Sequence, residues 1–172
     1  MEETKYKFSW DLLGDIALGR PNLGPDISLK VYRLMQFTLR DILEQDLGTE
    51  KADKIFYDAG KLAGTEFYKN VFQPNLELEE FISGLQQTFV DLKIGVLRIE
   101  QIDMEKGVIV LTVSEDVDCS GLPNIDSEIC VYDEGFIAGL LESYTGLNFK
   151  VKEVDCWCSG DRTCRFRAET TK

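Results

Sequence analysis

The chain has 172 residues, of which 44% are hydrophobic and 29% charged, and its formal net charge is −12. Length and composition predict one globular domain, residues 1–172, with a sizeable core, and the acidity, which favours solubility, excludes direct binding to nucleic-acid phosphates. The longest apolar run, residues 107–113, is too short to span a membrane, and Met-Glu-Glu-Thr-Lys at the start lacks the apolar core of a signal peptide. We therefore expect a cytoplasmic protein without a membrane partner.

The first half of the chain is predicted to be helical. Residues 1–26 are rich in Gly and Pro and should be irregular, whereas residues 27–91 show apolar residues at helical spacing. Three helices are expected: one capped by Asp26 or Ser28 that stops at Gly48, one from Thr49 to about residue 69, and one from about residue 77. We interpret their apolar stripes as core, including the stripe of the first helix at Ile27, Val31, Leu34, Thr38 and Ile42.

In residues 92–172 the hydrophobic period changes to that of strands. Residues 94–99 and 108–113 read as paired strands, and the loop at 115–126, which holds Cys119, is expected to be solvated. A fourth helix should run from about residue 126 to Gly146, with Cys130 in its first turn. The fold class is therefore α+β, an antiparallel sheet with about four helices packed against it and a C-terminal metal-bearing β-hairpin.

One octapeptide pattern occurs twice. Residues 57–64 and 132–139 both fit Tyr-Asp-x-Gly-x-x-Ala-Gly, and small residues four apart share one face of a helix. The second and fourth helices could therefore pack closely against each other or line a cavity.

The densest chemical signal is residues 150–166, which hold Cys156, Cys158 and Cys164 around a Ser-Gly-Asp-Arg turn. This pattern predicts a β-hairpin that carries thiols. Cysteine and carboxylate groups are zinc ligands, and the chain contains no His. Five cysteines in a cytosolic chain favour a metal over disulfides, although a redox disulfide and plain buried thiols remain alternatives.

The motif Glu153-x-x-Cys156-x-x-x-Gly160-Asp161-x-x-Cys164-x-Phe166 resembles the C-terminal signature of the 4-vinyl reductase domain family, whose fold is similar to that of TRAPP subunits. The resemblance implies a zinc site formed by Cys130, Glu153, Cys156 and Cys164. In a regular strand Glu153 and Cys156 point to opposite faces, so either a bulge brings them together or Cys158 is the fourth ligand.

The resemblance also implies a function. Members of the family that sense aromatic compounds bind small apolar molecules between helices and sheet, beside a structural zinc ion. We therefore expect a zinc-bound domain that binds or senses a small hydrophobic molecule, forms a homodimer and signals through a protein partner. The alternatives are a reductase or accessory protein acting on vinyl groups of tetrapyrroles, and a TRAPP-like interaction module with a filled core. Binding is favoured over catalysis, because no dinucleotide fingerprint follows a strand.

Overall fold

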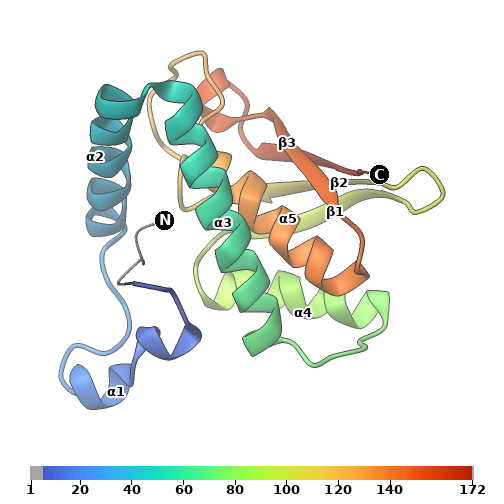
Figure 1. Cartoon of the computed structure of the whole chain (residues 1–172), viewed down its shortest axis with the longest axis horizontal. Helices are drawn as coiled ribbons and strands as arrows, with labels where there is room; N and C mark the ends of the chain where they lie inside the picture. The colour runs from blue at the N-terminus through green and yellow to red at the C-terminus, as the bar shows by residue number, and fades with distance from the viewer. Residues whose placement is uncertain (1–5, 172) are drawn as a thin grey trace.

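A computed structural model describes residues 6–171 (Figure 1). The expectation about a signal peptide rests largely on residues 1–5, which lie outside the described part. The expected α+β fold is confirmed, with the elements η1 (Trp10–Leu13), α1 (Ile16–Gly19), α2 (Leu29–Leu47), α3 (Thr49–Val71), α4 (Leu78–Asp91), β1 (Val96–Asp103), β2 (Val108–Ser114), α5 (Val131–Thr145), β3 (Phe149–Asp155), η2 (Trp157–Ser159) and β4 (Cys164–Thr170). Within residues 6–171, no helix combines the length and apolar character needed to cross a bilayer.

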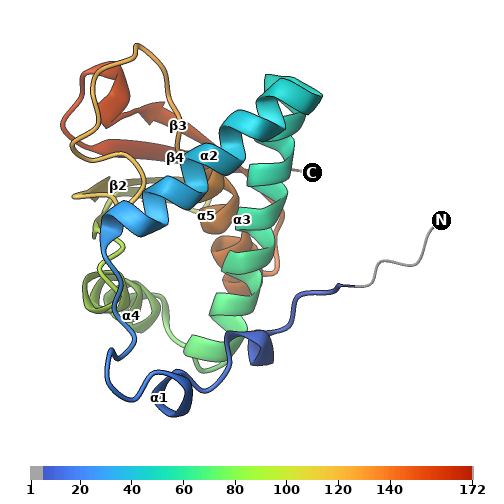
Figure 2. The same cartoon turned by 90° about the vertical axis from the view of Figure 1, so that its left-hand side faces the viewer.

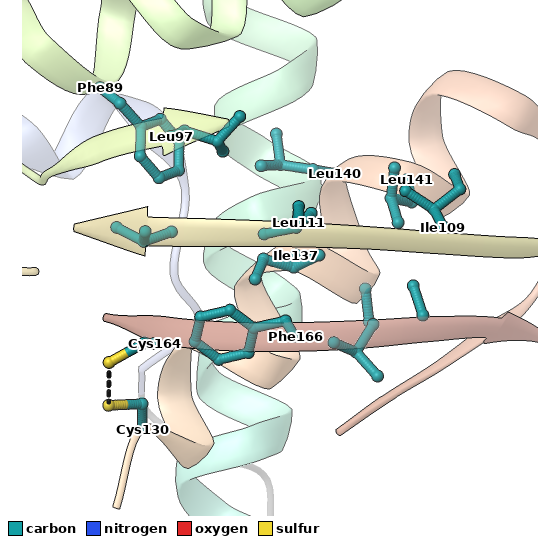
Figure 3. Packing of buried hydrophobic residues seen from close by; sticks show 14 of the residues in the cluster. Phe89, Leu97, Ile109, Leu111, Cys130, Ile137, Leu140, Leu141, Cys164 and Phe166 are labelled. Atoms are coloured by element: carbon teal, nitrogen blue, oxygen red, sulfur yellow. Dashed lines mark hydrogen bonds between the residues drawn. The ribbon is translucent and has the colours of Figure 1, made fainter. Parts of the chain in front are cut away.

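The four strands form one antiparallel sheet in the order β1-β2-β4-β3. Alternate residues of each strand point to one face, so Ile109 and Leu111 of β2 and Phe166 of β4 are all buried together. Figure 3 shows this face meeting Ile137 and Leu140 of α5. The core therefore lies between the sheet and α4 and α5, with α3 behind α5.

The repeated octapeptide is the contact between α3 and α5. An added Cβ at any of its four glycines would lie 2.0–2.2 Å from a carbonyl oxygen of the opposite helix: Gly60 (Tyr132), Gly64 (Phe136), Gly135 (Tyr57) and Gly139 (Lys61). The partner numbers rise together, so the two helices run parallel, and each residue type meets its counterpart in the other copy of the pattern. Mutual packing, one of the two expected arrangements, is therefore present.

Helix α2 begins and ends as predicted, because the Ser28 hydroxyl accepts a hydrogen bond from the Lys30 amide and Gly48 follows the last residue. The interpretation of its apolar stripe as core is wrong. None of its residues is buried, and Leu34 and Ile42 are 67% and 54% exposed. Figure 2 shows α2 crossing the outside of the molecule beside α3. Periodicity identified the face but not the surface that it meets.

Candidate metal centre and adjoining cavity

Four cysteine side chains converge at one end of the sheet. Cys119 comes from the loop after β2, Cys130 precedes α5, Cys156 follows β3, and Cys164 begins β4. All four are fully buried, and their sulfur atoms lie within 4.8 Å of one another. Figure 3 shows Cys130 facing Cys164 across the end of β4. Segments that lie 45 residues apart in the chain therefore meet at one point.

The spacing of these sulfur atoms fits a tetrahedral metal ion. Zinc–sulfur bonds of about 2.3 Å place two ligand sulfurs about 3.8 Å apart. The Sγ atom of Cys130 lies 3.9 Å from the Sγ atoms of both Cys156 and Cys164. Cys119 and Cys164 are closer, with 3.0 Å between their sulfurs, so a bound ion would require that pair to separate by about 0.8 Å.

Cys119 reaches the centre because its loop is folded inward. The Asp116 carboxylate accepts hydrogen bonds from the amides of Asp118 and Cys119, which forms a tight turn. Both aspartates are also buried, so the expectation of a solvated loop at 115–126 is wrong for this part of it. The sequence signal that could have indicated the turn is an Asp two and three residues before the bonded amides.

Glu153 lies beside the four thiols. Its Oε2 atom accepts a hydrogen bond of 3.1 Å from the Cys130 amide, while its Oε1 atom is buried without a hydrogen-bond partner. The β3–β4 pairing shifts between Glu153 and Asp155, and this bulge lets both Glu153 and Cys156 be buried although they are three residues apart. The bulge is the first of the two arrangements expected for these residues.

Cys158 and Cys130 differ in detail from the expected positions. Residues 157–159 form the short helix η2 instead of a strand, and the Cys158 amide donates to the Cys156 sulfur at 3.4 Å. The Cys158 side chain is buried but is not among the four clustered thiols. Cys130 is the N-cap of α5, one residue before the first turn in which it was expected.

The protonation pattern of the metal-free cluster indicates why a cation suits it. Hydrogen bonds from the neighbouring thiols lower the pKa of Cys156, whereas the Cys119 and other thiols raise the pKa of Cys130. Burial raises the pKa of Glu153 to about 8 and that of Asp116 to about 7. Without a metal the cluster therefore holds one thiolate among thiols, and several ionised ligands require a positive ion.

An apolar cavity of about 170 Å³ lies next to this centre, between α4, α5 and strands β1 and β2. Figure 3 shows part of its wall converging from the sheet and α5, at Leu97, Ile109, Leu111, Ile137, Leu140 and Leu141. Two lining residues carry hydroxyl groups. Tyr144 donates to the Leu76 carbonyl at 3.2 Å and Thr145 to the Leu141 carbonyl at 2.7 Å, so both donors are already used within the protein.

The model of the 4-vinyl reductase domain family matches residues 109–170, which run from β2 to β4 and contain all four clustered cysteines. The predicted resemblance to this family is confirmed over this segment. Two uncharacterized proteins of Methanocaldococcus jannaschii are similar over 84% of this chain. One is 26% identical over 78% of its own length, and the other is 27% identical over 76% of its length.

Three solved structures share the fold. The phenol-responsive sensory domain of the transcription activator PoxR, solved with phenol, has a TM-score of 0.63 and 14% identity over 84% of this chain and 75% of its own. A vinyl-4-reductase family protein from Methanocaldococcus jannaschii has 0.62 and 18% over 99% and 100%. Trafficking protein particle complex subunit 3 from Naegleria fowleri, covalently bound to palmitic acid, has 0.57 and 11% over 84% and 95%.

Proposed function

We propose that this protein is a ligand-sensing domain that binds a small uncharged hydrophobic molecule in the cavity between α4, α5 and the sheet. The cavity, about 170 Å³ and apolar, is the observation that carries the proposal. The similar PoxR domain was solved with phenol, which supports ligand binding by this fold. The interaction-module alternative expected a filled core, so the cavity counts against it.

Size and chemistry define the ligand class. An apolar cavity of about 150 Å³ accommodates benzene, so this cavity suits a hydrocarbon of about one ring. The hydroxyls of Tyr144 and Thr145 already donate within the protein, and a ligand hydroxyl would have to compete for those contacts. Burying an unpaired hydroxyl costs about 1–3 kcal/mol. We therefore expect toluene to bind about tenfold or more tightly than phenol.

Calorimetric titration with toluene and phenol tests this specificity. Ile82, which is half-buried on α4 at the cavity wall, provides the blocking variant Ile82→Trp. Leu92→Trp, at a position 56% exposed, is the matched control. Toluene binding should be lost in the first variant and kept in the second. Equal binding by both variants, or tighter binding of phenol, would contradict the proposal.

The proposal includes a structural zinc ion held by Cys130, Cys156 and Cys164. Two groups compete for the fourth position: Cys119, whose sulfur belongs to the cluster, and Glu153, which the sequence motif indicates and whose Oε1 atom has no partner. We favour Cys119, because one oxygen of Glu153 already binds the Cys130 amide. Four protein ligands leave no open coordination position, so the ion would supply stability instead of an activated water molecule.

X-ray absorption at the zinc edge of the purified protein distinguishes the two ligand sets. Four sulfurs near 2.3 Å indicate Cys119, whereas three sulfurs and one oxygen near 2.0–2.2 Å indicate Glu153. Metal analysis of Cys119→Ser and Glu153→Gln gives an independent readout, with zinc loss expected for the first and retention for the second. A chain without bound metal would contradict the zinc centre but would leave the cavity proposal untouched.

The proposed sensor is a cytoplasmic homodimer that reports ligand binding to a protein partner. A closed cavity has no surface of its own, so its state must reach a partner through the helices that enclose it. Sedimentation of the chain with and without toluene tests this part of the proposal.

A further inference from the structure

Helix α2 turns its apolar face away from the protein. Five apolar side chains of this outer face are between 51% and 67% exposed. At 100° per residue they and Thr38 fall within one continuous stripe. The outer face of α2 consists of Val31, Leu34, Met35, Thr38, Leu39 and Ile42.

Polar contacts fix α2 in this orientation. The Tyr32 hydroxyl donates to the Asp118 carboxylate at 2.7 Å, and Arg33 donates to three backbone carbonyls of the same loop. Further along the helix, Arg40 forms a salt bridge with Asp53 of α3. Rolling the helix to bury its apolar face would break these bonds and bury the charges. The apolar face is therefore held outward.

The exposed area is large for a surface without a partner. Five apolar side chains at roughly 100 Å² each give about 500 Å², against the ~300–600 Å² of the largest patch on a typical monomer. Ile55 of α3 is 42% exposed and continues the patch across a groove that Met35 and Leu39 also line. With polar rim residues this face approaches the ~800 Å² per partner of a standard interface.

We infer that the outer face of α2 is the dimer interface, packed antiparallel against the same face of a second copy about a twofold axis near Thr38. An isologous contact needs one self-complementary patch, and an apolar stripe complements itself. Lys30 lies at the start of α2 and Asp46 near its end, so antiparallel packing places opposite charges together at both rims. A net charge of −12 disfavours an anionic membrane surface as the occupant.

This inference rests on the proposed homodimer and adds its location. Analytical ultracentrifugation of the full chain should give twice the chain mass of 19.5 kDa. Leu34→Glu places a charge in the interface and should raise the dimer dissociation constant about 100-fold or more. Leu147→Glu, at a position 48% exposed beyond α5, should leave the dissociation constant unchanged. Circular dichroism verifies that both variants fold.

A cysteine placed at the axis gives a second readout. All five native cysteines are buried, so Thr38→Cys would introduce the single exposed thiol. Mild oxidation should link two copies, whereas Leu147→Cys should stay unlinked. A dimer insensitive to Leu34→Glu and not linked through residue 38 would overturn this interface but keep the homodimer. A monomeric wild-type chain would overturn both, as would a monomer that binds neutral lipid vesicles through this face.

Discussion

The close contact between α3 and α5 makes Gly60→Ala a sharp test of the fold. A Cβ at this position would lie 2.0 Å from the Tyr132 carbonyl oxygen, whereas ordinary contacts begin near 3.4 Å. The obstacle is backbone of a buried helix, which cannot rotate away as a side chain can. The two helices would have to separate by about 1 Å or more along a tightly packed contact.

The expected cost follows from two opposing effects. Overpacking of a well-packed interior costs about 1–3 kcal/mol or more. Replacing Gly by Ala inside a helix contributes about 0.5–1 kcal/mol in the opposite direction. The contact should dominate here, because every atom near the new methyl group is main chain. We expect a net loss of about 2 kcal/mol, which lowers the melting temperature by about 4–8 °C for a chain of this length.

Thermal and urea unfolding followed by circular dichroism measures this loss. Gly135→Ala should be destabilising to a similar degree, since its Cβ would lie 2.0 Å from the Tyr57 carbonyl oxygen. Gly19→Ala is the control, because nothing lies within 4 Å of its Cβ position and its backbone is unstrained. If Gly60→Ala were as stable as the control, the glycine-mediated contact between the helices would be refuted.

Three further predictions concern the metal centre and its surroundings. Chelation should lower the free energy of unfolding by several kcal/mol and release protons on reloading, which calorimetry in buffers of different ionisation enthalpy measures. In the chelated protein, burial raises the pKa of Glu153 from 4.5 to about 8, so stability should fall as the pH rises through that interval, and urea titrations of Glu153→Gln should show a weaker fall. Glu134→Gln should cost about 1–3 kcal/mol in urea unfolding, because the buried Glu134 carboxylate accepts from both the Lys152 ammonium and the Glu153 amide, while Glu66→Gln on the surface should be near neutral.

Helix boundaries could be predicted because their signals are local. Ser28 and Gly48 bound α2, and Thr49 begins α3, as expected from capping and helix-stop chemistry. The fate of the apolar stripe on α2 was not local. Periodicity shows that Val31 and Leu34 share a face, but the polar bonds of Tyr32 and Arg33 decide which side meets the protein.

The same distinction applies to the metal centre. The hairpin motif identified Cys156 and Cys164, and the family resemblance added Cys130, three thiols that the structure brings together. Cys119 was missed because its approach depends on the Asp116 turn and on contacts made by α2, nearly ninety residues earlier in the chain. No spacing rule relates such distant segments. Glu153, in contrast, reaches the thiols through a bulge, a backbone irregularity that strand alternation alone does not reveal.

The thiol centre and the cavity share their structural supports. Helix α5 carries Cys130 at its N-terminal cap and Ile137 on the cavity wall, while β2 lines the cavity and pairs with β4, which begins with Cys164. A metal bound by Cys130 and Cys164 would therefore fix the position of α5 against the sheet, and with it the width of the cavity. Ligand affinity should then depend on metal loading even though no thiol lines the cavity. Because coupling is reciprocal, toluene should also slow the loss of zinc to a chelator.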